Sequence, residues 1–436
     1  MIASGAKKMA DTSTRAKTLL YLAPLTLLVA FCDPNEGLIT IPLQFFLKNR
    51  LQLEASELAT FRLVAALPLY FSFAFGLARD CWSPFGLKDR GYLILFGGIS
   101  ALLYLWFAFA PLSYLNLLFA VFLLTSAHLF IDSAQSGLSS TLARQLDMSG
   151  QVSALWGSLA ALPAVAALTI GGHLSDALEH RPASDALRSL FVLAAVMFVV
   201  LALYATWKPP SVFAAIETNA APTTRVGDKL RQFFTHWPVY PALGIWLLFK
   251  FAPGSSTPLQ YYLQDTLHAA DHVWGEWNAI FYASRIPAYV LYAMVCRHVS
   301  LRALLLIGTL ITIPQFVPLL LVDSVQSAMV LAVPIGLMGA IANAAYLDLI
   351  IRSCPAGLQG STLMLAGALY YVADRFGDVI GIALYAHGGF VACVALITLA
   401  YALILLVLRY VPAELSDTDR RCRSSCPGSR AHRSER

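Results

Sequence analysis

The most constraining feature of this chain is a ten-residue sequence that occurs twice. Pro42 to Leu51 reads PLQFFLKNRL, and Pro258 to Leu267 reads PLQYYLQDTL, 216 positions later in a chain of 436 residues. In both copies an apolar segment interrupted by Pro and Gly precedes the repeat, and a Pro-x-Tyr triplet lies in the next apolar segment. Paired, interrupted segments at matching places in two halves are typical of the central site of a secondary transporter. The sequence therefore predicts a duplication around a central site.

The segments around these repeats are long and apolar. Of all residues 58% are hydrophobic and 13% are charged, whereas about a quarter are charged in soluble domains. A helix needs about 20 residues to cross the hydrocarbon core, and continuous stretches of that length favour helices over a β-barrel. The twelve stretches that meet this length are 18–47, 57–78, 92–111, 114–143, 151–172, 188–207, 237–263, 275–296, 301–322, 326–351, 360–386 and 388–411. The expected fold is an all-α integral membrane protein with twelve transmembrane helices in two pseudo-symmetric six-helix bundles.

Basic residues predict the orientation and the domain limits. With both termini in the cytoplasm, the cytoplasmic segments hold 22 of the 30 Lys and Arg residues and the opposite loops hold four, as the positive-inside rule requires. We expect a multi-pass protein of a plasma membrane or a bacterial inner membrane. The expected parts are a cytoplasmic tail (1–17), a first bundle (18–207), a cytoplasmic linker (208–235), a second bundle (236–412) and a disordered basic cytoplasmic tail (413–436).

The loop between the second and third apolar stretches carries a recognisable motif. It reads GLARDCWSPFGLKDRGY and contains Gly76, Asp80, Lys88 and Arg90. This loop resembles the G-x-x-x-D-x(n)-G-x-[RK]-[RK] signature of the major facilitator superfamily, in the longer form of the folate-biopterin transporter family. The segments APGSSTPLQYYL (252–263), VSLRALLL (299–306) and CPAGLQGSTLMLAGAL (354–369) resemble the same family, so the resemblance spans most of the chain.

The resemblance implies a secondary transporter that moves a folate- or pterin-like organic anion by alternating access. It also implies that Gly76, Asp80, Lys88 and Arg90 form a gate on the cytoplasmic side. The basic pair of the family is interrupted here by Asp89, and Gln359 replaces a frequent acidic residue. A permease of the same fold for a cell-wall muropeptide or an acyl-CoA-like solute is the alternative, and an integral membrane enzyme is a more distant one.

Nine ionisable residues lie inside the apolar stretches, where each unpaired charge costs about 2.5–3.5 kcal/mol. They are Asp33, Glu36, Arg62, Asp132, Lys250, Arg285, Asp374, Arg375 and Asp378. Such residues usually face a cavity or pair with one another. We therefore expect Lys250, Arg285, Arg62, Asp33 and Glu36 in the substrate site, with the aromatic residues Tyr261 and Tyr289. The other interpretations are helix caps for Asp33 and Glu36, and structural ion pairs for Lys250 and Arg285.

Two groups of these residues are candidates for proton coupling. Asp374 and Asp378 lie one helical turn apart and near Arg375, so their mutual repulsion favours a proton-binding state. An Arg375–Asp378 pair that only fixes helix packing is the alternative. His128 and Asp132 also lie one turn apart and form a second candidate relay, although a histidine at such a place is often a packing residue.

The sequence also argues against other classes of protein. It contains no nucleotide phosphate loop, no H-E-x-x-H or G-x-S-x-G motif, and no nucleic-acid module. Cys422, Cys426 and His432 lack a second pair of ligands for zinc. We therefore expect no enzymatic activity, no cofactor and no metal. The expected partners are a small-molecule substrate, a proton and the lipid bilayer.

Overall fold

A computed structural model describes residues 2–35, 43, 46, 47, 51, 52, 55–179, 183–217, 226–269 and 271–416. Within these ranges every regular element is a helix. The α-helices are α1 (Ile2–Phe31), α3 (Ala55–Ala65), α4 (Leu67–Tyr70), α5 (Ser72–Cys81), α6 (Asp89–Phe109), α7 (Tyr114–Gln145), α8 (Ser149–Glu179), α9 (Ala183–Thr206), α10 (Pro210–Glu217), α11 (Val226–Thr235), α12 (Val239–Lys250), α13 (Thr257–Tyr261), α14 (Asp271–Val295), α15 (Leu301–Thr312), α16 (Val325–Ser353), α17 (Gln359–Val407) and α18 (Ala413–Ser416).

Seven helices in the described part of the chain are long and apolar enough to cross a membrane. They are Ser13–Phe31, Asp89–Phe109, Tyr114–Gln145, Arg188–Thr206, Leu301–Leu321, Val325–Ser353 and Gln359–Tyr410. The last of these contains Gly389, whose φ of +65° separates two helical segments within α17. The integral membrane class is thus confirmed, while the count of twelve spans and their division into two six-helix bundles stay predictions.

Several expected spans are interrupted rather than continuous. The first helix ends at Phe31, where the chain approaches Pro34, and six residues separate the end of α12 at Lys250 from the start of α13 at Thr257. Gly254 supplies a φ of +107° in this second break, a conformation that costs glycine little. Both interruptions, near Pro34 and around Gly254, lie at the places that the Pro and Gly residues of the sequence predict. The stretch expected at 57–78 is also divided, into α3, α4 and α5, because Pro68 cannot continue the backbone ladder.

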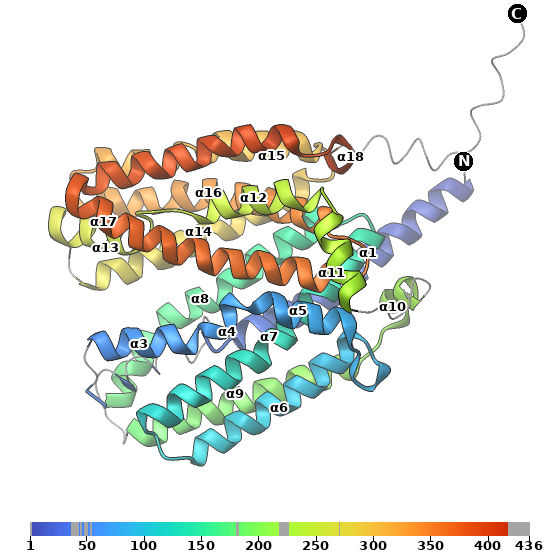
Figure 1. Cartoon of the computed structure of the whole chain (residues 1–436), viewed down its shortest axis with the longest axis horizontal. Helices are drawn as coiled ribbons and strands as arrows, with labels where there is room; N and C mark the ends of the chain where they lie inside the picture. The colour runs from blue at the N-terminus through green and yellow to red at the C-terminus, as the bar shows by residue number, and fades with distance from the viewer. Residues whose placement is uncertain are drawn as a thin grey trace, which may run out of the picture.

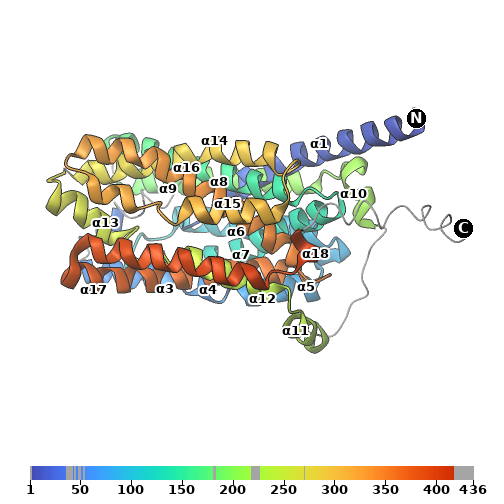
Figure 2. The same cartoon turned by 90° about the horizontal axis from the view of Figure 1, so that it is seen from above.

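The helices from the two halves of the chain occupy different sides of the molecule. In Figure 1 helices α3 to α7 and α9 lie in the lower part, and α12 to α17 lie in the upper part. The view from above shows that α1, α10, α11 and α18 approach one end of the molecule (Figure 2). This end also carries the α5–α6 loop (Trp82–Lys88), and we call it the loop end.

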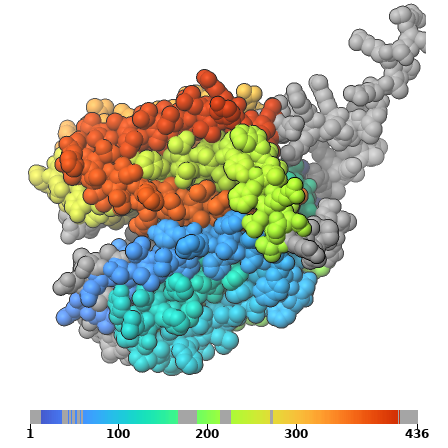
Figure 3. Space-filling view, in the orientation of Figure 1, coloured from blue at the N-terminus to red at the C-terminus, as the bar shows by residue number. Residues whose placement is uncertain are grey.

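Several pairs of helices join the halves. The most extensive contacts are those of α8 with α14 and of α5 with α17, and α16 also packs against α8 and α17 against α7. Figure 3 shows contact between the halves toward the loop end and a notch at the opposite edge, beside the yellow α13 region. The space between the halves is therefore closed at the loop end.

Small residues permit this close packing between the halves. A Cβ atom on Gly157 of α8 would lie 2.3 Å from the Tyr289 ring of α14. A Cβ on Gly76 of α5 would lie 2.7 Å from the backbone oxygen of Gly360 in α17. Helix backbones in a membrane approach most closely at such positions.

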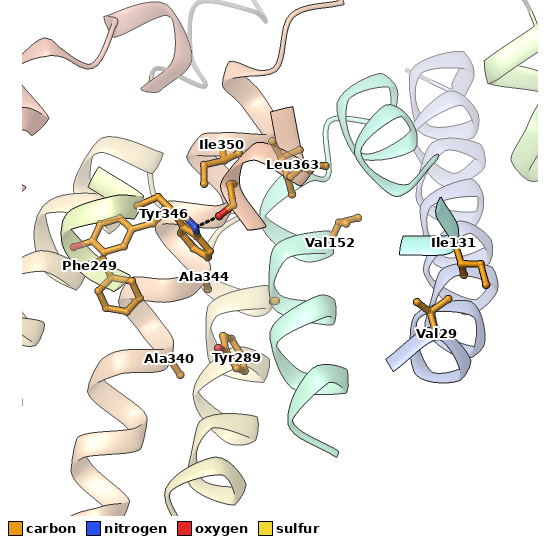
Figure 4. Packing of buried hydrophobic residues seen from close by; sticks show 14 of the residues in the cluster. Val29, Ile131, Val152, Phe249, Tyr289, Ala340, Ala344, Tyr346, Ile350 and Leu363 are labelled. Carbon is orange, nitrogen blue, oxygen red and sulfur yellow. Dashed lines mark hydrogen bonds between the residues drawn. The ribbon is translucent and has the colours of Figure 1, made fainter. Parts of the chain in front are cut away.

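Large side chains fill the space between helices within the C-terminal half. Tyr346 and Phe249 form an edge-to-face pair with ring centroids 5.0 Å apart, and Tyr289 is 1% exposed. Figure 4 shows Tyr289 between the helix of Ala340 and the helix of Val152, which are α16 and α8. This aromatic packing holds α14 in place beside the interface of the two halves.

The segments expected to be tails and linker contain additional helices. The first helix begins at Ile2, inside the expected tail of residues 1–17, and the linker 208–235 contains α10 and α11. The amphipathic α11 docks at the loop end, because Phe233 is buried against Phe73 with ring centroids 5.6 Å apart. The C-terminal tail lies outside the described residues beyond Ser416.

Candidate functional site

A cavity of about 700 Å³ lies between the two halves of the chain. Residues of α1, α5, α7 and α8 line one side of it, and residues of α12, α14, α16 and α17 line the other. This volume falls within the range of small-molecule sites, about 300–1,000 Å³. The two sides differ in their chemistry.

The N-terminal half contributes a polar wall. Asp33 lies at the break after α1, and His128 and Asp132 lie one turn apart on α7. Gln135, on the next turn, donates to the Thr26 hydroxyl at 2.9 Å. Asp33, predicted in the substrate site, and His128 and Asp132, predicted as a proton relay, therefore line one cavity, and their roles stay predictions.

Two buried nitrogen atoms beside this cavity lack hydrogen-bond partners among the described residues. They are Nδ1 of His128 and Nε1 of Trp156, and both side chains line the cavity. His128 is 6% exposed. Because buried polar groups are nearly always paired, these nitrogens are suited to bind polar atoms of a ligand.

The C-terminal half contributes an aromatic wall. Trp246, Trp274, Tyr282 and Tyr371 line the cavity from α12, α14 and α17. The Trp246 indole donates to the Ala366 carbonyl at 2.8 Å, which fixes the orientation of its ring. Fixed aromatic faces of this kind offer stacking surface for a flat ring.

A chain of hydrogen bonds lies behind the aromatic wall and joins two predicted cations. Lys250 donates to the Asn343 Oδ1 at 2.9 Å, and Asn343 donates to the Tyr289 hydroxyl at 3.0 Å. Arg285 donates to the same hydroxyl at 2.7 Å. Three helices, α12, α14 and α16, therefore hold the two cations in one network. Charged residues in the sequence do not indicate this network, because Asn343 carries no charge.

Aromatic rings surround both cations of this network. Lys250 Nζ lies 4.5 Å from the Trp246 ring centroid, and the Arg285 guanidinium lies 5.6 Å from that of Tyr282. Cation–π contacts of this length stabilise a partly desolvated charge. Among the described residues no carboxylate pairs with Arg285, so the alternative interpretation of this residue as a structural ion pair finds no acidic partner there.

A smaller pocket of about 190 Å³ adjoins the central cavity on the side away from the loop end. It shares Leu69 and Tyr371 with that cavity, and Arg62 and Arg375 line it from opposite halves of the chain. Both arginines are exposed. Arg62, which was predicted in the substrate site, thus lies at an approach to the central cavity and not on its wall.

The two acids of the eleventh predicted helix have different surroundings. Asp378 accepts hydrogen bonds from the backbone N–H and the hydroxyl of Thr257, at 3.0 and 2.9 Å, and so caps the start of α13. Gly377 and Gly381 pack against the break before this cap, where a Cβ on Gly381 would lie 2.8 Å from the Gly254 nitrogen. Asp374 is half-buried one turn earlier. Neither acid lines the central cavity.

The remaining predicted site residues are placed as follows. Tyr261 is 49% exposed and lies near the Tyr385 ring rather than on the cavity wall. Tyr289 contributes its hydroxyl to the cation network instead of a stacking surface. Glu36 lies outside the described residues. Over the described ranges no group of three potential ligands is suited to a metal ion.

At the loop end four residues, Arg79, Asp80, Asp89 and Ser361, form a cluster that we call the latch. Asp80 accepts from the backbone N–H and the hydroxyl of Ser361 at 2.7 and 2.6 Å, at the start of α17. Arg79 pairs with Asp80 at 2.5 Å and donates through Nε to Asp89 at 2.6 Å. Because the Asp80 carboxylate meets a helix N-terminus, the helix dipole adds to the attraction.

Arg79 is the cation of the latch, although the sequence motif points to other residues. Burial alone lowers the pKa of Arg79, but the carboxylates of Asp89 and Asp80 outweigh this effect and raise it above its ordinary value. Lys88, which was expected here, is exposed, and Arg90 donates to the Ala205 carbonyl at 2.9 Å at the end of α9. The signal that could have identified Arg79 is its place directly before Asp80.

Further bonds at the loop end join the halves around the latch. Arg144 of α7 donates to the Cys354 carbonyl, and Lys229 of the linker helix α11 donates to the Asp80 carbonyl. Gln232 of the same helix donates to the Ala356 carbonyl at 3.1 Å. The linker thus takes part in closing the loop end.

The family model described as the BT1 family matches residues 35–387. A search of curated proteins finds no match. Solved structures give the fold at low sequence identity. The proton:xylose symporter XylE of the major facilitator superfamily superposes with a TM-score of 0.64 at 12% identity, covering 91% of this chain and 96% of that one.

Two other transporters give similar values. A bacterial homologue of the iron transporter ferroportin, in an outward-facing state, has a TM-score of 0.66 at 16% identity and covers 90% of this chain and 99% of its own. The human organic anion transporter MFSD10 has a TM-score of 0.60 at 15% identity, and the match covers 91% of this chain and 98% of that one. At these identities the likeness establishes the fold: that of a major facilitator transporter.

Proposed function

The chain belongs to the BT1 family, the folate-biopterin transporters of the major facilitator type, and from this premise we propose that it carries a small organic anion by alternating access. The favoured substrate is folate- or pterin-like, and transport is coupled to a proton. The observation that carries the proposal is the two-sided cavity, with Asp33, His128 and Asp132 opposite an aromatic wall backed by Lys250 and Arg285.

The two walls suit different parts of such a molecule. A flat heterocycle offers faces to Trp246 and Trp274 and ring nitrogens to the unpaired nitrogen atoms of His128 and Trp156. A carboxylate is attracted by the cations behind the aromatic wall, and arginine binds carboxylates through two parallel hydrogen bonds. Arg62 and Arg375 beside the approach would attract the same anion first.

For the proton we favour Asp132 over the acids of α17. Asp132 lines the cavity one turn from His128, whereas Asp378 caps α13 through two hydrogen bonds from Thr257. The Asp378 carboxylate is thus engaged in holding the start of α13, away from the cavity. Because Asp132 lines the cavity, its carboxylate can exchange a proton with whichever side of the membrane the cavity is open to. Substrate and proton would then be taken up and released on the same side.

We further propose twelve spans in two bundles of six, 18–207 and 236–412, joined by the linker 208–235, with both termini in the cytoplasm. The excess of basic residues around the loop end supports this orientation. With the loop end in the cytoplasm and the notch at the opposite edge, the conformation described here is open to the outside.

The test is a counterflow assay in proteoliposomes that contain the purified chain. Folate, a pterin, a muropeptide and an acyl-CoA are each loaded inside the vesicles in turn, and the same solute is supplied outside in radiolabelled form. Accumulation driven by folate or pterin, and not by the other two, is the expected result. Counterflow with only the muropeptide or only the acyl-CoA would show that the chain is a transporter with a different substrate. No counterflow with any of the four solutes would refute the proposal.

A further inference from the structure

A second cavity lies on the flank of the molecule, separate from the central one. It has a volume of about 490 Å³ and lies between α1, α8 and α14. Leu155 and Ser158 line it from α8, Val290 and Met294 from α14, and Leu19 from α1. No residue of this groove lines the central cavity. The transport mechanism proposed above gives this flank groove no role.

Most of the flank groove is apolar and open to the surroundings of the helices. Val290 and Met294 lie one turn apart on α14 and are 51% and 57% exposed. In a membrane-spanning bundle such side chains face lipid tails. The groove therefore offers a path along which an acyl chain can lie against the protein.

One end of the groove is positively charged. Arg297 and His298 line it directly after α14 ends at Val295, at the loop end of the molecule. Both side chains are exposed, and the lining residues include no carboxylate. Their positions continue the row of Val290 and Met294 along one face of α14, because residues three and four apart share a face.

We propose that this groove binds an anionic phospholipid. The acyl chain occupies the apolar part beside Val290 and Met294, and the phosphate group contacts Arg297 and His298. Two features of the groove determine the choice of ligand, namely its apolar length and the Arg297 cation, without any lining carboxylate, at one end. Basic sites between transmembrane helices on the cytoplasmic side bind anionic head groups through the same combination.

Because of the position of the groove, a bound lipid can affect which conformation the transporter adopts. Tyr289 forms part of its inner wall, and the same side chain packs on Gly157 and holds Arg285 and Asn343. A lipid in the groove contacts α8 and α14 together, one of the helix pairs that join the halves. Since a ligand stabilises the state that it binds better, the lipid should favour the conformation in which these helices meet at the loop end.

The experiment measures lipid binding to the full-length chain purified in detergent. Native mass spectrometry counts bound phosphatidylglycerol, with phosphatidylcholine of the same acyl chains as the neutral probe and inorganic phosphate as the head-group probe. We expect retained phosphatidylglycerol and neither of the others. Arg297→Gln should weaken binding about fivefold, because one basic side chain near an anionic surface contributes about 1 kcal/mol.

Two further variants separate a built site from general surface charge. Arg302→Gln removes an exposed cation at the same end of the molecule but outside the groove, and it should leave binding unchanged. Met294→Trp fills the groove without changing charge and should displace the lipid. Equal binding of the neutral lipid, an equal loss in Arg302→Gln, or full binding in Met294→Trp would each overturn the proposal, whereas none of these results bears on the transported substrate.

Discussion

The Asp80 carboxylate of α5 accepts both the backbone N–H and the hydroxyl of Ser361, at 2.7 and 2.6 Å, at the first turn of α17. These residues are 281 positions apart in sequence. The Asp80 side chain is fully buried. Arg79 lies on the same helix as Asp80 and stays beside it when the halves separate. The contact with the N-terminus of α17 is lost in that separation, so the Asp80–Ser361 pair is suited to hold the loop end closed.

Asp80→Asn should open the loop end, because the amide keeps the shape of the side chain but loses the charge that attracts Arg79 and the helix dipole. Breaking a buried ion pair costs about 3–5 kcal/mol. The measurement is alkylation of Cys354, a 1% exposed thiol beside the latch, in a background where the other cysteines are serine. We expect at least a tenfold faster rate in Asp80→Asn, and an unchanged rate would show that the latch does not control access.

The pH dependence of that alkylation provides a second measurement. Burial raises the pKa of the Cys354 thiol to about 11, compared with about 8.5 for a free cysteine. Because the thiolate is the reacting species, the closed form should react about tenfold faster for each pH unit between 7 and 10. In the open form the rate should level off above about pH 8.5. A plateau near 8.5 in the unaltered chain would contradict the closed loop end.

Gly76→Ala should have a similar effect by steric means. The added Cβ would lie 2.7 Å from the Gly360 backbone oxygen, so α5 and α17 must move apart. Gly98→Ala is the matched control, because nothing lies within 4 Å of a Cβ at that position of α6. Cys354 alkylation should accelerate only in Gly76→Ala. Equal rates in both variants would show that the helix contact tolerates the methyl group.

Tyr289→Phe should weaken binding of an anionic substrate while the ring packing remains. The hydroxyl orients Arg285 and Asn343 at 2.7 and 3.0 Å, and a hydrogen bond to a charged group contributes about 1.5–3 kcal/mol. We therefore expect KM for uptake to rise about tenfold or more. Tyr261→Phe, at an exposed ring, is the control and should leave KM unchanged. An unchanged KM in Tyr289→Phe would show that the cation network does not contribute to substrate binding.

Asp132→Asn should uncouple transport from the proton gradient. The neutral amide cannot carry a proton, so accumulation under an inward proton gradient should be lost while substrate exchange at equal pH continues. Asp374→Asn and Asp378→Asn test the competing assignment to the acids of α17. If Asp132→Asn still accumulates substrate and one of the α17 variants does not, the proton site belongs to that helix.

Asp378→Ala should lower stability through its cap on α13. Loss of a helix N-cap costs about 0.5–2 kcal/mol, and Thr257 supplies both donors to this carboxylate. Thermal unfolding of Asp378→Ala, Thr257→Val and the double variant forms a cycle. We expect the double variant to be little less stable than Asp378→Ala alone. Additive losses would mean that the two side chains stabilise the protein independently.

The sequence by itself determined the membrane class, the family resemblance and the two helix breaks. Each of these follows from residues close together in the chain. Apolar length sets what can cross the bilayer, and the residues around Pro34 and Gly254 end the helices through local backbone constraints. For the same reason the placement of His128 and Asp132 one turn apart on α7 could be predicted as a local feature.

Only the tertiary structure decided how residues far apart in sequence combine. Charge counting identified Lys250 and Arg285, but the neutral Asn343 that joins them to Tyr289 lies on another helix. The motif indicated Lys88, whereas the fold turns Arg79 toward Asp80 and Asp89. Asp374 and Asp378 look equivalent in sequence, yet only Asp378 meets Thr257. Partner choice depends on which helix faces pack together, and spacing along one helix cannot specify that.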